Sequence, residues 1–307
     1  MIFRFDDSLE TVDNVRSVKV TADLLLYLSK HSHNLSCSGG LWKWLKQTVL
    51  SGNTYLSQWD IDLIERNRAL REITDEKRRY LSTVDVGFEK GMLTPEETFC
   101  FVQKRSLVIV ENAENDWAVI RKWIDILKND HRYKTINRIV CTRKDKGDLS
   151  PHNAGSGGQI INAIRQQKSV YKKGIGYKIS VLLDSDKTAL SDQYSSEKLR
   201  IKEEMDSAGI DGHILEKREI ENYFPLSVYR QAGMVRQEAF VPDYTDEEWD
   251  FIDIEGLDIL NYRKRDLPLL ADYLDRESLL SRLKEKDYGG EKINEVQNII
   301  LKFAKLS

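Results

Sequence analysis

The sequence contains few cysteines, no long apolar run and no strong excess of charge, and each of these absences excludes a class of protein. Its three cysteines, Cys37, Cys100 and Cys141, are scattered and form no C-x-x-C pair, which argues against a disulfide framework and against a zinc site. The longest apolar runs, such as Leu107–Val110 and Ile179–Leu183, have the length of a strand and fall far short of the ~20 residues that a membrane span needs. The first residues contain no apolar segment of the secretory type. We therefore expect a reduced, cytoplasmic protein with no membrane partner.

The charge balance does not by itself indicate a nucleic-acid-binding protein, because the net charge is −3 and the pI is about 6.1. Carboxylates in a metal site would lower the net charge, however, while a bound cation would restore it locally. One segment, residues 165–178, contains no acidic residue and carries five basic ones, Arg165, Lys168, Lys172, Lys173 and Lys178. This segment is either a solvated helix end and loop or an edge that contacts phosphates, and the sequence leaves both readings open.

The hydrophobic pattern divides the chain into a mainly helical region 1–103, a middle region 104–225 and a helical, acidic region 226–307. In the middle region, short β-branched runs alternate with amphipathic segments. We predict strands at 107–110, 137–141, 178–183 and 212–215, and helices at 116–127, 157–167 and 195–208. This alternation predicts an α/β domain with a largely parallel four-stranded sheet between helices. In the flanking regions we predict long helices at 60–80, 266–285 and 291–306.

Acidic residues follow two of the predicted strands. Glu111 comes directly after the first strand, and Asp184 and Asp186 come after the third. Because the carboxyl ends of parallel strands open onto one edge of a sheet, we expect these three side chains to converge in one crevice. Carboxylates held together in this way repel one another unless a cation neutralises them, and hard oxygen ligands select Mg²⁺ or Mn²⁺.

A glycine-containing loop precedes the predicted helix 157–167. Its residues Gly155, Ser156, Gly157 and Gly158 would leave backbone N–H groups exposed at a helix N-terminus, where an anion or a phosphate can bind. The alternative is an ordinary flexible loop before a helix.

The fourth predicted strand runs into the segment Lys217–Phe224, which combines acids and bases. Charged side chains directly after a buried strand are costly without partners. A second metal held by Glu219 or Glu221, with Lys217 or Arg218 facing a phosphate, would satisfy them. A salt-bridged helix start is the alternative.

Taken in order, these motifs resemble the Toprim superfamily. The likeness covers Leu107–Asn112 with Asp116, Gly155–Gly158, Asp184–Asp186 and Lys217–Phe224. The last segment, Arg-Glu-Ile-Glu-Asn-Tyr, is the most specific and is similar to that of the OLD-like (overcoming lysogenization defect) nucleases. The resemblance implies a parallel sheet with a divalent-metal site at its acidic edge.

The resemblance further implies a metal-dependent endonuclease that hydrolyses phosphodiester bonds with two Mg²⁺ or Mn²⁺ ions. Carried over by motif, Glu111 is the first-strand acid, Asp184 and Asp186 are the Asp-x-Asp pair, and Glu219 or Glu221 is a further metal ligand. Lys217 or Arg218 is the basic residue near the scissile phosphate.

The sequence departs from the family pattern after the first strand. Asn112 stands where a glycine commonly follows the first acid, and position 115, where a second acid is usual, is Asn115. Either Asp116 takes the role of that acid, or Glu114 does, or the ligand is missing.

The resemblance also suggests partners. OLD-like proteins often carry an ATPase module and often serve in bacterial antiviral or anti-plasmid defence, but this sequence contains no G-x-x-x-x-G-K-[ST] motif. An ATPase or sensor would therefore be a separate subunit. DNA and RNA are equally compatible substrates. The sequence does not decide whether the chain forms a homo-oligomer. The alternative function is a non-catalytic Toprim scaffold that binds nucleic acid or a partner ATPase.

Overall fold

The computed structural model describes residues 1–11, 15–31, 33–51, 53, 55–70, 73–171, 176, 178–236 and 242–306. The chain divides into two compact units, residues 1–105 with 304–307, and residues 106–303. The prediction of an α/β protein with a parallel four-stranded sheet among helices is confirmed. In the described part of the chain, no helix combines the length and the apolar character of a membrane span.

The first unit contains a parallel sheet that the sequence did not reveal. Its strands β1 (Ile2–Phe5), β2 (Asn34–Ser36) and β3 (Thr83–Val86) are arranged in the order β2-β1-β3. Each has three or four residues, too short for a period-2 pattern to stand out between helices. The helices are α1 (Val15–Lys30), α2 (Gly39–Trp44), α3 (Gln58–Leu70), α4 (Asp75–Tyr80) and α5 (Pro95–Val102), with helical turns at Asp7–Thr11 and Leu45–Leu50. The long helix predicted at 60–80 is thus two helices.

The second unit is built on the parallel sheet β5-β4-β6-β7. Its strands are β4 (Ser106–Val110), β5 (Leu149–Asn153), β6 (Ile179–Leu183) and β7 (His213–Ile214). Three of the four strands lie where we predicted them, but the strand predicted at 137–141 is wrong.

Residues 137–141 lie instead in helix α7 (Lys134–Asp145). Ile136 and Val140 are fully buried at the helical spacing of four residues, and a five-residue window does not separate that pattern from a strand. The true second strand, β5, escaped notice because it is an edge strand that contains Pro151 and buries only Leu149 completely.

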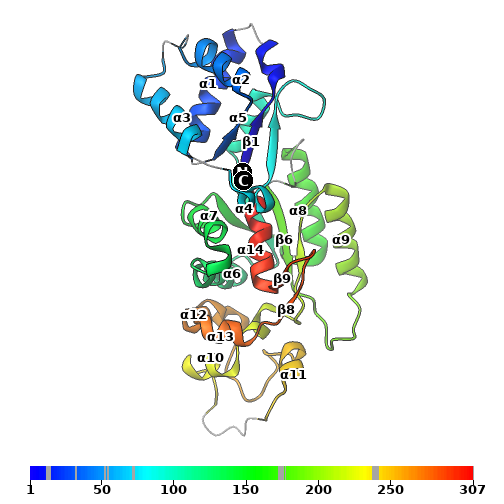
Figure 1. Ribbon diagram of the computed structural model, residues 1–307. Helices are drawn as coiled ribbons and strands as arrows, with labels where there is room; N and C mark the ends of the chain where they lie inside the picture. Colours follow the sequence, from blue (N-terminus) through cyan, green and yellow to red (C-terminus); the bar gives the residue numbers. More distant parts are fainter. Residues whose placement is uncertain are drawn as a thin grey trace. The chain divides into compact units, whose positions relative to one another are not determined.

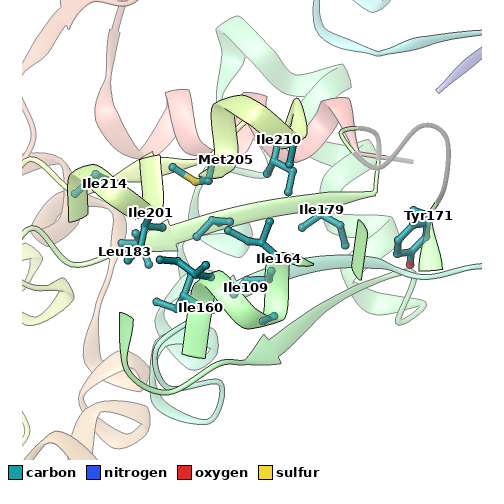
Figure 2. Close-up of a cluster of buried hydrophobic side chains, with 14 residues drawn as sticks. Ile109, Ile160, Ile164, Tyr171, Ile179, Leu183, Ile201, Met205, Ile210 and Ile214 are labelled. Atoms are coloured by element: carbon teal, nitrogen blue, oxygen red, sulfur yellow. The ribbon is translucent and has the colours of Figure 1, made fainter. Parts of the chain in front are cut away.

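Helices cover both faces of this sheet. Helices α6 (Asn115–Leu127) and α7 lie on one side of it, and α8 (Gly157–Val170) and α9 (Ser196–Ala208) lie on the other (Figure 1). Figure 2 shows the core between the sheet and the α8–α9 pair, in which Ile109 and Val181 of the strands meet Ile164 and Ile201 of the helices. Both faces of the central strands are therefore buried, as expected for a parallel sheet.

Residues 226–303 belong to the same compact unit as the sheet. They form α10 (Leu226–Gln231), α11 (Asp246–Phe251), a 3₁₀ turn at Lys264–Asp266, α12 (Leu267–Tyr273), α13 (Arg276–Ser281), the hairpin β8 (Glu285–Asp287) and β9 (Lys292–Asn294), and α14 (Glu295–Lys305). The helix predicted at 266–285 is therefore interrupted. Helix α12 packs on α6, and Gln297 of α14 exchanges hydrogen bonds of 2.8 and 3.0 Å with Asn137 of α7.

Candidate metal centre at the carboxyl edge of the second sheet

The loops that follow β6 and β7 fix each other through main-chain hydrogen bonds. The backbone N–H groups of Ser185 and Asp186 both donate to the carbonyl oxygen of Arg218, each over 3.0 Å. The Ser185 hydroxyl donates to the carbonyl oxygen of Lys217 over 2.7 Å. In return, the Ile220 N–H donates to Asp184 Oδ1 over 3.0 Å. The Asp-x-Asp turn and the segment after β7 therefore form a single braced element.

Asp186 adopts a left-handed backbone conformation, with φ of +57°. Aspartate tolerates this region better than most residues, but it is sparsely populated and tends to occur at functional sites. The conformation lets Asp184 point into the protein, where it is 7 % exposed, while the side chain of Asp186 stays 54 % exposed.

Asn112 positions Asp116, an acid in the first turn of α6, at the acidic edge. Its Oδ1 accepts hydrogen bonds from the N–H groups of Glu114 and Asn115, each over 3.1 Å, and so starts the helix. The Asp116 carboxylate then folds back and accepts from the Asn112 N–H over 2.9 Å. Glu114 is exposed, whereas Asp116 is 6 % exposed. Of the alternatives left open by the sequence, the structure brings Asp116 to the acidic edge.

A small cavity of about 10 Å³ lies between these acids. It is lined by Glu111, Asp116 and Asp184 together with apolar residues of the strands and adjoining loops. This is about the smallest volume that holds one water molecule or ion. Two buried carboxylate oxygens of the acidic edge, Asp116 Oδ1 and Glu221 Oε2, have no hydrogen-bond partner. A buried carboxylate oxygen without a partner is costly unless the carboxyl is protonated or meets a further positive group.

The electrostatics of the cluster lead to the same conclusion. Burial raises the pKa of Asp116 to about 7, and the nearby Asp184 carboxylate adds to this effect. Burial likewise raises the pKa of Glu221, Glu111 and Glu219. Several carboxyls whose ionised forms are disfavoured therefore share one crevice. A divalent cation bound between them would offset this negative charge, and carboxylates are donors that Mg²⁺ and Mn²⁺ prefer.

Two lysines that the sequence analysis did not single out lie among these acids. Lys264, from the 3₁₀ turn before α12, places its Nζ 3.3 Å from Asp184 Oδ2, 3.8 Å from Glu221 Oε1 and 3.9 Å from Glu219 Oε2. Lys198, from the first turn of α9, places its Nζ 2.6 Å from Glu111 Oε1 and 3.0 Å from Asp186 Oδ2. No local pattern marks either lysine, because each meets the acids only through the tertiary fold.

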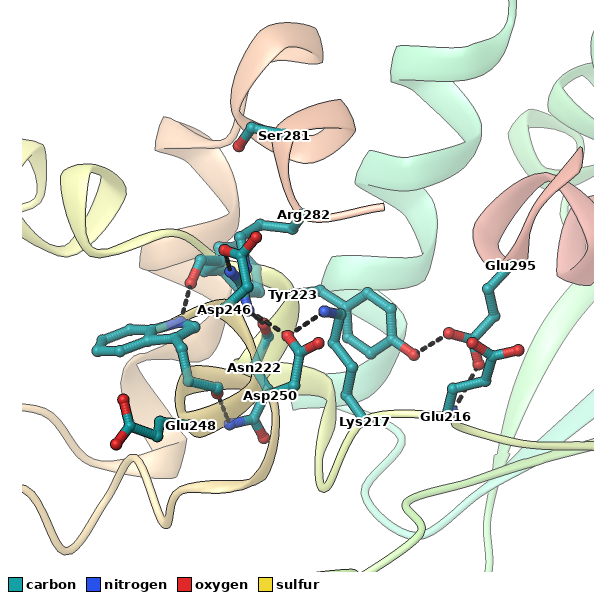
Figure 3. Close-up of polar contacts among 12 residues, drawn as sticks. Glu216, Lys217, Asn222, Tyr223, Asp246, Glu248, Asp250, Ser281, Arg282 and Glu295 are labelled. Atoms are coloured by element: carbon teal, nitrogen blue, oxygen red, sulfur yellow. Dashed lines mark hydrogen bonds and ion pairs between the residues drawn. The ribbon is translucent and has the colours of Figure 1, made fainter. Parts of the chain in front are cut away.

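The structure places Lys217 away from the acidic edge. Its Nζ pairs with Asp250 and lies 5.4 Å from the ring centroid of Tyr223 (Figure 3). The Tyr223 hydroxyl donates to Glu295 of α14, which also accepts from the N–H of Glu216. The Asn222 amide donates to the carbonyl oxygens of Trp249 and Ile252. These residues anchor the segment after β7 to the C-terminal region.

Arg218 stays close to the site. Its side chain is 22 % exposed. Its Nε lies 3.6 Å from Glu219 Oε1, and its Nη2 lies 3.8 Å from Asp253 Oδ2. Of the two basic residues expected near a phosphate, only Arg218 is therefore near the acids.

The glycine loop adjoins the acidic edge, since the Gly155 N–H donates to the carbonyl oxygen of Glu111 over 3.1 Å. Gly155 has φ of +73°, and Ser156 caps α8 in a capping box with Gln159. The Glu197 carboxylate of α9 lies against Gly157, in the space that a Cβ there would occupy, so a carboxylate already covers part of this helix N-terminus. Gly158 has open space around it.

Only part of the basic segment 165–178 can be placed. Lys168 is exposed near the end of α8, and Arg165 pairs with Glu204 over 2.7 Å. Lys178 is 1 % exposed, so it does not offer its charge to a phosphate. The predicted phosphate-binding residues Lys172 and Lys173 lie outside the described residues.

A second acidic group lies on the surface of α6 and α7. Within the described ranges, Asp125, Cys141 and Asp145 are the one set of three Asp, Glu, His or Cys donors that lie within 4.8 Å of one another. The ammonium of Lys144 already pairs with both acids, at 2.5 and 3.1 Å, so this set needs no metal. Among the described residues of the sheet edge, no three such donors lie that close together, and Lys198 and Lys264 each contact more than one of its acids.

No family model, no curated protein and no solved structure matches this chain. The function of the chain is therefore inferred from the geometry of the site.

Proposed function

We propose that the protein is a divalent-metal-dependent phosphodiesterase that cleaves nucleic acid at the acidic edge of the second sheet. One observation carries the proposal. Two buried carboxylates of this edge, Asp116 and Glu221, each have an oxygen without a partner, and their pKa is raised. A protein that gained nothing from these acids would carry a purely destabilising feature there, and such clusters are typical of functional sites.

The residues fit Mg²⁺ or Mn²⁺. Asp184 reaches the cavity from the end of β6, and Asp116 reaches it from α6. Glu219 and Glu221 approach from the segment after β7, on the far side of Lys264. A bound cation would lower the pKa of an attacking water and stabilise charge on a phosphoryl group.

The basic role assigned to Lys217 or Arg218 passes to Lys264 and Arg218. The Lys264 side chain is 32 % exposed, so its ammonium can turn from the acids toward a bound phosphate. Arg218 is at the rim of the same cluster. Positive charge placed there would stabilise the transition state of phosphoryl transfer. Lys217 instead positions the segment that carries the acids.

The test is cleavage of plasmid DNA and of structured RNA in Mg²⁺, Mn²⁺ or EDTA, comparing the wild type with Asp184→Asn. We expect metal-dependent cleavage that falls at least about 100-fold in the variant, because loss of a metal ligand costs more than the 10- to 100-fold typical of its outer partners. Asp206→Asn, which changes an exposed acid of α9, is the matched control and should retain full activity.

A folded wild type that binds Mn²⁺ but cuts neither substrate would refute the nuclease and favour the scaffold. Capture of an ATPase subunit would then be the next measurement. The defence role comes from the resemblance alone. It predicts fewer phage plaques on cells that express the wild type than on cells that express Asp184→Asn.

A further inference from the structure

The acidic edge has two halves, and each half holds one ammonium group. Lys198 lies between Glu111 and Asp186, and Lys264 lies among Asp184, Glu219 and Glu221. Each ammonium balances part of the negative charge of the carboxylates around it. The two lysines differ, however, in how firmly they are held.

Lys198 is held as a permanent part of the fold. Its side chain is 4 % exposed, and its two ion pairs are short, at 2.6 and 3.0 Å. It belongs to the first turn of α9, where its N–H donates to the Ser195 hydroxyl, and α9 packs on α8. Removing its ammonium from the Glu111–Asp186 pair would require the whole side chain to leave a buried position.

Lys264 is held loosely. Its side chain is 32 % exposed, and its three ion pairs are longer, at 3.3 to 3.9 Å. The unpartnered oxygens adjoin this half: Glu221 Oε2 belongs to a Lys264 partner, and Asp116 faces Asp184 across the cavity, which Glu111 of the other half also lines. In this half, one ammonium does not satisfy the acids, and it has solvent into which it can move.

Building on the proposed function, we propose that the centre takes a single divalent cation, between Asp116, Asp184, Glu219 and Glu221, and that the Lys198 ammonium stands in place of a second cation between Glu111 and Asp186. This proposal differs from the two-ion centre that the resemblance implies. In the cation-bound protein Lys264 is displaced toward solvent or substrate, while Lys198 stays where it is. Glu111 then acts by positioning Lys198.

The experiment is the stoichiometry of Mn²⁺ binding to the cation-free full chain, measured by titration calorimetry and by electron paramagnetic resonance. We expect one Mn²⁺ in the wild type, without the spin coupling of two ions held about 3.5–4 Å apart. Lys198→Met keeps most of the apolar stem and removes the charge. It should bind two Mn²⁺ ions that couple magnetically.

Two further variants keep the inference falsifiable if Lys198→Met fails to fold. Glu111→Gln should still bind one Mn²⁺, whereas a two-ion centre would lose one of two. Lys264→Met should also bind one Mn²⁺, about tenfold or more tightly, because a competing charge 3–4 Å from the ligands is gone. Two Mn²⁺ ions in the wild type, or a single Mn²⁺ lost in Glu111→Gln, would overturn the inference.

The stoichiometry is independent of cleavage. One Mn²⁺ in a protein that cuts nothing would leave the inference standing and refute the nuclease. Two Mn²⁺ ions in an active nuclease would do the reverse.

Discussion

The two units contain parallel sheets with the same order of their first three strands, but carboxyls at their carboxyl edges have pKa values shifted in opposite directions. In β2-β1-β3 and in β5-β4-β6-β7, the first strand of the unit lies between the second and the third. A switch in strand order of this kind is where α/β sheets commonly bind ligands. Among the described residues, a cluster of buried acids lies at this position in the second sheet and not in the first.

At the carboxyl edge of the first sheet, the polar side chains after β1 are hydrogen-bonded to neighbouring backbone groups. Ser8 donates its N–H to Asp6 over 2.9 Å and accepts from the Phe88 N–H over 3.0 Å. Hydrogen bonds from Ser8 lower the pKa of Asp6, so this carboxylate is stable as an anion. At the second sheet, burial raises the pKa of Asp116 and leaves one of its oxygens without a partner. The two edges thus share a strand order, and they differ in that the carboxyl of the second is buried and lacks a partner for one oxygen.

The largest expected difference is in the stability lost when Asp250 or Asp85 is replaced by alanine. Asp250→Ala leaves Lys217 and Arg282, both less than 9 % exposed, without their shared partner. Breaking a buried ion pair of this kind costs about 3–5 kcal/mol. Asp85→Ala breaks only the pair with Arg4, which is 62 % exposed, and should cost less than about 1 kcal/mol. Urea unfolding of both variants measures the difference, and equal losses would contradict it.

The second contrast concerns pH. The folded protein keeps a proton on Asp116 up to about pH 7, whereas an unfolded chain releases it near pH 4. The stability that Asp116 contributes is therefore present at low pH and is lost as the pH rises from about 4 through about 7. Asp116→Asn should stabilise the cation-free protein at pH 8 by a few kcal/mol, at about 1.4 kcal/mol per unit of pKa shift.

The gain from Asp116→Asn should vanish near pH 4. Its control is Glu114→Gln, which neutralises an exposed acid two residues away and should change little at either pH. A pH-independent effect of Asp116→Asn would show that its ionisation is not what destabilises the site. The measurement is thermal unfolding in EDTA across this range.

The third contrast is between the two units in the presence of a cation. A ligand that binds only the folded state, at 100 times its Kd, stabilises that state by about 2.7 kcal/mol. With Mn²⁺, amide hydrogen exchange should slow in peptides from residues 106–303 and stay unchanged in peptides from residues 1–105. Asp184→Asn should abolish the protection. Equal protection of both units would mean that Mn²⁺ binds elsewhere.

The smallest effect on Mn²⁺ binding is expected from a substitution at the carboxyl edge of the first sheet. A Cβ at Gly87 would lie 2.8 Å from the Ser8 hydroxyl oxygen and 2.9 Å from the Asp6 Cβ. Gly87→Ala should therefore destabilise the first unit by about 1–3 kcal/mol, the usual cost of overpacking. Mn²⁺ affinity should stay at the wild-type value. A weakened Mn²⁺ site in Gly87→Ala would show that the two edges are coupled.

The sequence predicted most of the second sheet because its central strands are buried on both faces. Such strands appear as nearly continuous apolar runs, as in Ile179–Leu183, which is interrupted only by Ser180, and the acids directly after them are conspicuous. The edge strand β5 and the short strands of the first unit carry no such signal. They are held by pairing with strands distant in the sequence, and a local window does not contain that information.

The acids of the candidate site were visible in the sequence, but their counter-charges were not. Lys198 and Lys264 lie 87 residues from Glu111 and 80 residues from Asp184, respectively. Lys217 illustrates the opposite error. Its neighbourhood in the sequence suggested a phosphate contact, whereas the fold buries it against Asp250, a residue of α11.

The segment after β7 is hydrogen-bonded to the C-terminal region, and these contacts limit how far the chain can be shortened without disrupting the acidic edge. Residues 107–224 carry every recognisable motif. A fragment limited to them would lack Glu295, the hydrogen-bond partner of Tyr223, and the carbonyl groups of Trp249 and Ile252, which accept from Asn222. It would also lose the carbonyl oxygen of Asp250, to which the Arg218 N–H donates over 2.9 Å. A chain truncated at the limits of its motifs would keep the six acids in its sequence and lose the scaffold that holds them together. A fragment that spans 106–303 keeps both.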